Sequence, residues 1–253
     1  MRRIEIFVAS VCLLISCGAM ALGQTSVVAH RGVWDAPASA QNSIVALALA
    51  DYIGCYGSEF DVWLTGDSAL VVNHDASFGG RAMETSSLQQ LQQLRLANGE
   101  QLPSLIDYFT AAQSTSTRLI LELKHHSSAT SESTAVEKIV ALAEAMGLSE
   151  RMEYISFSLH ACREFVRIAP VGTPVFYLNG DIAPAELHAM GITGIDYHHS
   201  VIKAHPEWVD EAHALGMKVN VWTVNDASTM QWLIDLGVDL ITTNAPTLLQ
   251  SLL

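Results

Sequence analysis

The sequence predicts an α/β protein built as a single (β/α)8 barrel, the TIM barrel. Strand-like and helix-like segments alternate from Gln24 to the end of the chain, which is the pattern of parallel strands joined by helical crossovers. The strand-like segments are apolar runs, as expected for strands that are covered on both faces. The 253 residues also suit a barrel of this kind, which typically needs roughly 250.

Each predicted element follows from its local pattern. The strands are short apolar runs, at about 27–30, 58–64, 69–73, 118–123, 152–157, 174–178, 194–198, 217–223 and 238–243. Helical patterns lie between them, over 43–53, 86–96, 102–113, 132–146, 160–169, 184–190, 206–215 and 227–236. Glycines expected at helix C-termini follow three of these, at Gly147, Gly216 and Gly237. An open, doubly wound sheet uses the same alternation and is the alternative architecture.

The composition limits the classes of function that this protein can have. Half of the residues are hydrophobic and only 15% are charged, which suits one large core and argues against disorder. The formal net charge is −13, so electrostatic binding to nucleic acid is not expected. An acidic protein that binds phosphate needs local cations, either a metal ion or a few placed Arg and Lys side chains.

Residues 1–23 have the pattern of a secretory signal peptide. Arg2 and Arg3 precede the apolar run IFVASVCLLIS, and small residues follow. Cleavage is expected either after Gly23 or before Cys17, where LLISC resembles a bacterial lipobox. The mature protein, residues 24–253, is therefore predicted to be exported and to be periplasmic or lipid-anchored in a bacterial envelope.

Two cysteines, Cys55 and Cys162, remain in the predicted mature chain. An oxidising compartment would allow them to pair. Cys55 lies in the small-residue run IGCYG just before a predicted strand, and Cys162 lies at the start of a predicted helix. A disulfide and two buried free thiols stay open as alternatives.

Polar side chains recur where the predicted strands end. In a (β/α)8 barrel this is the face that carries the chemistry. The residues are His30, Arg31, Glu59, Asp61, His74, Glu122, Lys124, Ser158, Tyr197, His198, Trp222, Asn225 and Asn244. One or two buried polar groups would be ordinary for a barrel core, but so many at one rim predict a functional site.

Three of these residues predict a metal site. Side chains at i and i+2 of a strand point the same way, so Glu59 and Asp61 share a face, as do Glu122 and Lys124. Three carboxylates brought together in a poorly solvated pocket must take up protons or a cation. Oxygen ligands alone favour one hard divalent ion, Ca²⁺ or Mg²⁺. The alternative is a structural ion pair between Glu122 and Lys124.

His30 and His74 end two different predicted strands. Two imidazoles beside a metal suit an in-line displacement, in which one accepts a proton from the nucleophile and the other donates one to the leaving oxygen. Arg31 is suited to bidentate phosphate binding, and Lys124 to offsetting the charge that develops on phosphoryl oxygens. His198 is expected near the barrel mouth. The other histidines are expected at the surface, at positions 125, 126, 160, 188, 199, 205 and 213.

A series of motifs resembles one known family. They are HRG at 30–32, QNS at 41–43, GSEFDVWLTGD at 57–67, VVNHD at 71–75, LPSLIDYF at 102–109, LELK at 121–124, WTVN at 222–225 and GVDLITTNAP at 237–246. Together they resemble the glycerophosphodiester phosphodiesterase family, related to bacterial phosphatidylinositol phospholipases C, over nearly the whole mature chain. The resemblance implies a (β/α)8 barrel that cleaves glycerophosphodiesters to glycerol 3-phosphate and an alcohol with a divalent cation.

The resemblance also implies roles for individual residues. His30 and His74 would be the acid/base pair, and Arg31 and Lys124 would contact the phosphate. The metal ligands would be Glu59, Asp61 and Glu122, and Trp222 would line the glycerol or alcohol end of the pocket. The chain departs from the family where Ala40-Gln41-Asn42 replaces the usual Pro-Glu-Asn, which changes the charge beside Arg31.

Two alternatives to a phosphodiesterase remain. A glycoside hydrolase could use Glu59 and Glu122 as an acid and a nucleophile, although that chemistry does not need His30, His74 or Lys124. A non-catalytic binding barrel of the same family is the other, and Gln41 is the feature that suggests it.

Overall fold

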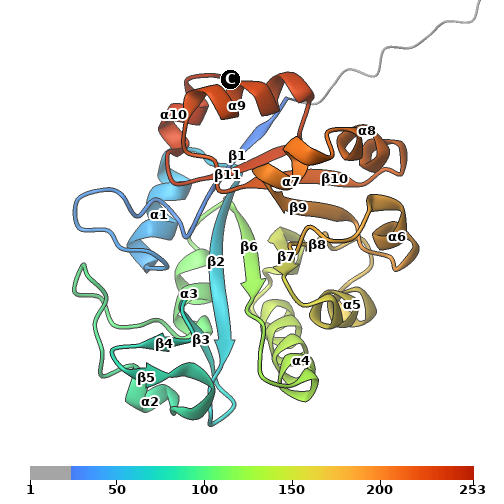
Figure 1. Ribbon diagram of the computed structural model, residues 1–253. Coiled ribbons are helices and arrows are strands. Elements are labelled where there is room, and N and C mark those ends of the chain that lie inside the picture. The colour runs from blue at the N-terminus through green and yellow to red at the C-terminus, as the bar shows by residue number, and fades with distance from the viewer. Residues whose placement is uncertain (1–23) are drawn as a thin grey trace, which may run out of the picture.

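The computed structural model describes residues 24–253 and shows a closed barrel of parallel strands (Figure 1). The strands are β1 (Ser26–Ala29), β2 (Gly57–Leu64), β6 (Arg118–Leu123), β7 (Met152–Ser156), β8 (Val175–Tyr177), β9 (Gly194–His198), β10 (Lys218–Trp222) and β11 (Leu240–Thr243). Neighbouring strands pair in this order, and β1 pairs with both β11 and β2. This closure confirms the predicted (β/α)8 barrel, and the open-sheet alternative is wrong.

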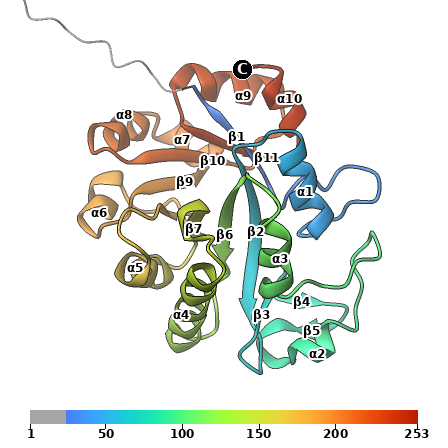
Figure 2. The same ribbon diagram turned by 180° about the vertical axis from the view of Figure 1, so that it is seen from behind.

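Helices surround the barrel on its outside (Figures 1 and 2). They are α1 (Ile44–Tyr52), α3 (Leu105–Ala112), α4 (Ala129–Ala145), α5 (Leu159–Ile168), α6 (Pro184–Ala189), α8 (Glu207–Ala214), α9 (Ala227–Leu236) and α10 (Pro246–Gln250). Several begin at a serine whose side chain accepts a backbone N–H of the first turn, as Ser43 does for α1 and Ser128 for α4. Gly237 ends α9 in the left-handed region, with φ 85°, as the sequence predicted.

The chain leaves the barrel between β2 and α3. β3 (Leu70–Val72) pairs antiparallel with β2, so the predicted strand at 69–73 is not a barrel strand. A hairpin of β4 (Ser77–Phe78) and β5 (Arg81–Ala82) follows, then a 3-10 turn at Met83–Thr85 and α2 (Leu88–Leu91). Figures 1 and 2 show these elements together to one side of β2. This excursion places His74 two residues after the end of β3.

The helix predicted over 86–96 is wrong beyond its first turn. α2 ends at Leu91, and the chain then turns so that Arg95 bridges Gln101 in antiparallel fashion. Leu91 and Leu96 are buried in a small separate cluster under the excursion. Tertiary pairing has therefore overridden the helical spacing of the leucines.

The main core lies between the barrel and its helices, and a smaller cluster fills the barrel interior. The interior cluster consists of Val28, Ile120, Ile155, Phe176, Leu178 and Leu240. Burial of a large apolar side chain contributes roughly 1.5–3 kcal/mol. The polar groups at the strand ends therefore lie next to a rigid and poorly hydrated apolar interior.

A further helix, α7 (His199–Ala204), follows β9 directly, and a 3-10 turn at Ser149–Arg151 precedes β7. Within residues 24–253, every helix is too short or too polar to cross a bilayer. Cys55 and Cys162 are buried free thiols, so the disulfide alternative is wrong. The predicted signal segment 1–23, with Cys17, lies outside the described residues.

Candidate active site

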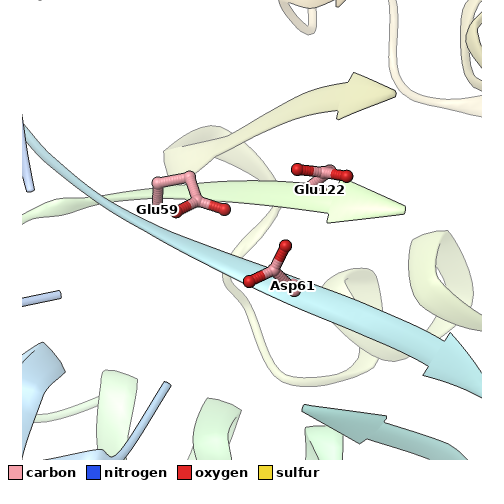
Figure 3. Close-up of side chains that lie close together, drawn as sticks. All are labelled: Glu59, Asp61 and Glu122. Carbon is pink, nitrogen blue, oxygen red and sulfur yellow. The ribbon is translucent and has the colours of Figure 1, made fainter. Parts of the chain in front are cut away.

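Three carboxylates meet at the mouth of the barrel. Glu59 and Asp61 lie on β2 and Glu122 on the adjacent β6, where Asp61 and Glu122 are direct partners in the parallel register. One ligand oxygen from each side chain lies within 4.8 Å of the other two. Figure 3 shows Asp61 and Glu122 on neighbouring strands, with Glu59 on the same strand as Asp61. The predicted convergence of these acids is present in the structure.

The chemistry of this triad fits a cation. Glu59, Asp61 and Glu122 are 3%, 1% and 8% exposed. Burial and the neighbouring Asp61 charge raise the pKa of Glu122 to about 7, and burial together with both other acids raises the pKa of Glu59 well above its usual value. Within the described chain, the buried Oε1 of Glu122 has no hydrogen bond in good geometry. A divalent ion would satisfy these oxygens, which makes the triad a candidate metal site.

Lys124 neutralises part of this charge. Its Nζ lies 2.7 Å from Glu122 Oε1 and 3.1 Å from Asp61 Oδ1. Burial raises the pKa of the Asp61 carboxyl, but Lys124, with smaller contributions from other neighbours, outweighs it and leaves that pKa lowered. The Glu122–Lys124 ion pair is therefore present, and it lies beside the triad without excluding it. The Lys124 side chain is 12% exposed and contacts Glu122, which lines the cavity described below.

Arg31 is held at the triad by an unusual backbone conformation. Its φ of 58° is left-handed, which costs of the order of 1–3 kcal/mol for a residue other than glycine. The conformation lets Arg31 N donate to Glu59 Oε2 at 2.7 Å, while its Nη1 donates to Gln41 Oε1 at 2.6 Å. The buried Nε of Arg31 lies 3.8 Å from Asp61 Oδ2, in an ion pair, but has no hydrogen-bond partner among the described residues. A phosphate oxygen would supply that partner.

Gly32 is required by the same turn. It has φ 74°, and a Cβ at this position would lie 2.7 Å from the Ala46 backbone in α1. Any side chain would therefore push the strand-to-helix connection away and displace the preceding His30 and Arg31. This explains the glycine of the HRG motif in physical terms.

Asn42 supports Asp61 and was not singled out from the sequence as a site residue. Its Nδ2 donates to Asp61 Oδ2 at 2.8 Å, and its Oδ1 accepts from Asp61 N at 3.1 Å. Asn42 also has a left-handed φ of 62°, a conformation that asparagine tolerates better than most residues. The QNS motif beside HRG was the available signal.

His30 is fixed in one tautomer by its neighbours. Trp34 Nε1, which can only donate, lies 3.3 Å from Asn244 Oδ1, so this atom of Asn244 is an acceptor. His30 Nδ1 lies 2.7 Å from the same oxygen and must carry the proton. Burial and the nearby Arg31 charge lower the pKa of His30 to about 4. At neutral pH, Nε2 of a neutral His30 is therefore free to accept a proton.

His74 reaches the same cavity from the excursion. Its Nδ1 lies 2.7 Å from Asp75 Oδ1, which orients the ring and leaves Nε2 for other partners. His30, Arg31, Glu59, His74 and Glu122 all line one cavity of about 250 Å³. We call this the inner cavity. The two predicted acid/base residues, the three acids and the arginine are thus brought together, and their catalytic roles remain predictions.

Apolar side chains also line the inner cavity. They include Phe157, Leu178 and Trp222, and the carboxyl-bearing Asp196 lines it as well. Trp222 is in the predicted position, packs edge-on against Phe157 and donates through Nε1 to the Asp196 backbone at 2.9 Å. Asp196 was missed by the sequence analysis. The sequence placed Tyr197 at the rim instead.

A model of the glycerophosphoryl diester phosphodiesterase family matches residues 30–248, which include every residue of this cavity. The chain belongs to the glycerophosphoryl diester phosphodiesterase family. It is accordingly an enzyme of the phosphoric diester hydrolase class, and the glycoside hydrolase alternative is set aside.

Relatives of this phosphodiesterase are similar over almost their whole length. The glycerophosphodiester phosphodiesterase of Caldanaerobacter subterraneus subsp. tengcongensis is 28% identical, over 88% of this chain and 95% of its own. A crystal structure of a glycerophosphodiester phosphodiesterase from Parabacteroides distasonis is 46% identical, with a TM-score of 0.88, covering 90% of this chain and 96% of the other. These similarities agree with the closed barrel described above.

One rim prediction for the phosphodiesterase is corrected by the structure. Tyr197 is fully buried on the helix-facing side of β9, and its hydroxyl donates to Ile182 O, because alternate strand residues face opposite ways. Ser158 and Asn225 follow the ends of β7 and β10 as predicted. Ser158 is the N-cap of α5, and Asn225 Oδ1 accepts from Asn244 N.

The prediction that His126 lies at the surface is also wrong. Its ring is buried beneath the site, where Nδ1 donates to Lys124 O at 2.6 Å and Nε2 accepts from Leu64 N at 2.9 Å. His126 thereby joins the end of β2 to the residue after β6. The sequence places it in a polar stretch, which concealed this role.

Proposed function

We propose that this phosphodiesterase hydrolyses glycerophosphodiesters to glycerol 3-phosphate and an alcohol, with a divalent cation at Glu59, Asp61 and Glu122. The observation that carries the proposal is the inner cavity, where three buried acids, Arg31 and two imidazoles face one another. The names of the relatives support the substrate class. A phosphodiesterase from Oleispira antarctica that shares this fold, at 23% identity, was solved with the product sn-glycerol 3-phosphate.

Ca²⁺ or Mg²⁺ is the cation expected at this site. All three ligands are carboxylates, and hard cations prefer oxygen donors. When bound, such an ion supplies positive charge that stabilises the phosphoryl group as negative charge develops on it. It would also relieve the repulsion among the three acids, so it would favour both the folded protein and the binding of substrate.

The residues around the triad bind the phosphoryl group and transfer protons. The free donors of Arg31 bind a phosphoryl oxygen, and Lys124 offsets charge on the same group. His30, neutral and with its Nε2 unprotonated, accepts the proton of the attacking oxygen. His74, which lines the same cavity, donates a proton to the leaving alcohol.

The experiment that tests this proposal is a turnover assay with glycerophosphocholine, with and without EDTA. Cation-dependent release of choline and glycerol 3-phosphate is the expected result. Binding of glycerophosphocholine without turnover would instead identify a non-catalytic binding barrel. Turnover that is indifferent to EDTA would remove the cation from the mechanism.

Gln41 is expected to position Arg31. The hydrogen bond from Arg31 Nη1 to Gln41 Oε1 involves a charged donor, and such bonds contribute about 1.5–3 kcal/mol. Gln41→Ala should therefore lower kcat/KM by about 10-fold, mainly through KM, because Arg31 loses its orientation. Gln41→Glu keeps an acceptor in the same place and is the matched control, expected within about 3-fold of the parent. Equal losses in the two variants would contradict this role.

We propose that the enzyme is exported, with cleavage after Gly23 or before Cys17. The pattern of residues 1–23 supports this. Mass spectrometry of the mature protein from a bacterial host distinguishes the two sites, because lipidation at Cys17 adds acyl chains that Cys17→Ser removes. An intact Met1 on the isolated protein would refute export by this segment.

A further inference from the structure

We propose that a second cavity beside His74 binds the leaving alcohol of the substrate, and that it is built for an alcohol carrying an ammonium group, such as choline or ethanolamine. This outer cavity has a volume of about 350 Å³ and is lined by Trp34, residues 39–42, residues 73–75, Phe78 and residues 96–97. The inference rests on the proposed function and specifies its substrate.

The first step concerns the geometry of a phosphodiester. Two ester arms diverge from its phosphorus, so a site that binds the whole substrate needs space on two sides of the phosphoryl group. His74 lines both the inner and the outer cavity. Gln41 and Asn42 line the outer cavity while bonding Arg31 and Asp61 at the inner one. A phosphoryl group held at Arg31 therefore has one cavity for each arm, and His74 lies between them.

The second step assigns the glycerol arm to the inner cavity. Asp196 is 1% exposed and lines that cavity. Its Oδ1 has no hydrogen-bond partner among residues 24–253. A glycerol hydroxyl would satisfy this oxygen, and the apolar wall of Phe157 and Trp222 would cover the carbon chain. The leaving alcohol is then left to the outer cavity.

The third step concerns the chemistry of the outer cavity. Trp34 and Phe78 are half-buried aromatic residues that line it, and Asp75 adds a carboxylate. No lysine or arginine is present among the described residues that line it. Aromatic faces attract ammonium groups by about 0.5–2 kcal/mol, and quaternary ammonium ligands are recognised in this way. An alcohol carrying a carboxylate or a further phosphate would be repelled by Asp75.

Another cavity provides the contrast. It has a volume of about 690 Å³ and is lined by α7 and the start of α9, with His199, Lys203 and Trp232 among its residues. Lys203 would repel an ammonium group, and neither catalytic histidine lines this cavity. An aromatic residue here, Trp232, serves as a control for aromatic residues in general.

The test compares kcat/KM for glycerophosphocholine with kcat/KM for glycerophosphoglycerol, two substrates with the same glycerol arm. We expect the parent to prefer glycerophosphocholine. Phe78→Leu keeps an apolar side chain against the small cluster but removes the aromatic face. It should lower kcat/KM for glycerophosphocholine by about 5-fold more than it lowers kcat/KM for glycerophosphoglycerol, because only the ammonium-bearing alcohol loses an aromatic contact. Trp232→Leu should leave the preference unchanged.

The possible outcomes separate this inference from the proposed function. Turnover of both substrates with a preference that Phe78→Leu does not change would overturn the alcohol site alone. A preference that moves with Trp232→Leu would place the alcohol in the other cavity and would also overturn it. Failure of the parent to hydrolyse either substrate with Ca²⁺ or Mg²⁺ present would refute the proposed function, and the alcohol site with it.

Discussion

EDTA is expected to abolish the phosphodiesterase activity, and added Ca²⁺ or Mg²⁺ is expected to restore it. Without a cation, three buried carboxylates stand within 4.8 Å of one another beside the position proposed for an anionic phosphoryl group. Lys124 and Arg31 offset only part of that charge. We expect kcat/KM to fall by at least about 10³-fold, comparable to the loss of one strong electrostatic contact in an active site. Activity measured against buffered free cation checks this.

The same cation should stabilise the fold, and more so at higher pH. The pKa of Glu122 is raised from 4.5 to about 7 in the folded protein. The folded state without metal thus holds this proton more tightly than the unfolded chain does. Its free energy of unfolding accordingly decreases as pH rises from about 4.5 to about 7. Glu59, whose pKa is also raised, acts in the same direction.

Bound Ca²⁺ or Mg²⁺ replaces the lost protons and reverses this effect. At about 100 times Kd, a ligand adds about 2.7 kcal/mol of stability, which corresponds to a Tm increase of roughly 5–10 °C for a domain of this size. We expect the increase to be larger at pH 8 than at pH 5, because protons compete with the cation at pH 5. Asp61→Asn is a matched control that keeps the side-chain shape and should reduce the increase. An equal Tm shift at both pH values would contradict the triad as the cation site.

The triad and the barrel were predictable because both depend on strand periodicity. Glu59 and Asp61 are two residues apart in a strand, so one face carries both, and parallel barrel strands place their carboxyl ends, including that of β6, at the same rim. The serines and glycines at helix ends likewise act locally, through the backbone of their own turn. Features that depend on such short-range interactions can be predicted from the sequence.

Other features of the site depend on contacts between distant segments. Asp196 and Tyr197 are adjacent in β9, and only the register of the closed barrel decides which of them faces the inner cavity. His126 follows Lys124 in a polar stretch, and its burial arises from β2, which is distant in sequence. Asn244 acts on His30 from the other end of the chain. Asn244 was expected at the rim from its place after a predicted strand, but its contact with His30 has no local sequence signal, and neither do the roles of Asp196 and His126.

His30→Ala is also expected to have a large effect on activity. A general base contributes about 10²–10⁴-fold to the rate, so we expect kcat to fall by at least about 10²-fold with little change in KM. The imidazole contacts Asn244 and lines the inner cavity, and neither contact is part of the main core, so the variant should fold. His160→Ala, at an exposed histidine that lines neither cavity, is the matched control and should retain full activity.

The pH profile distinguishes a base from a merely structural histidine. Burial and Arg31 lower the pKa of His30 to about 4, so this residue stays unprotonated at neutral pH. We therefore expect kcat/KM to stay high at neutral pH and to fall at acidic pH, where His30 becomes protonated. Asn244→Asp keeps an acceptor for Nδ1 but adds a negative charge, which favours the protonated ring and should move the acid limb to higher pH. Asn244→Leu removes the acceptor and should lower kcat without that displacement. If Asn244→Asp leaves the acid limb in place, His30 is not the group whose proton uptake limits the reaction.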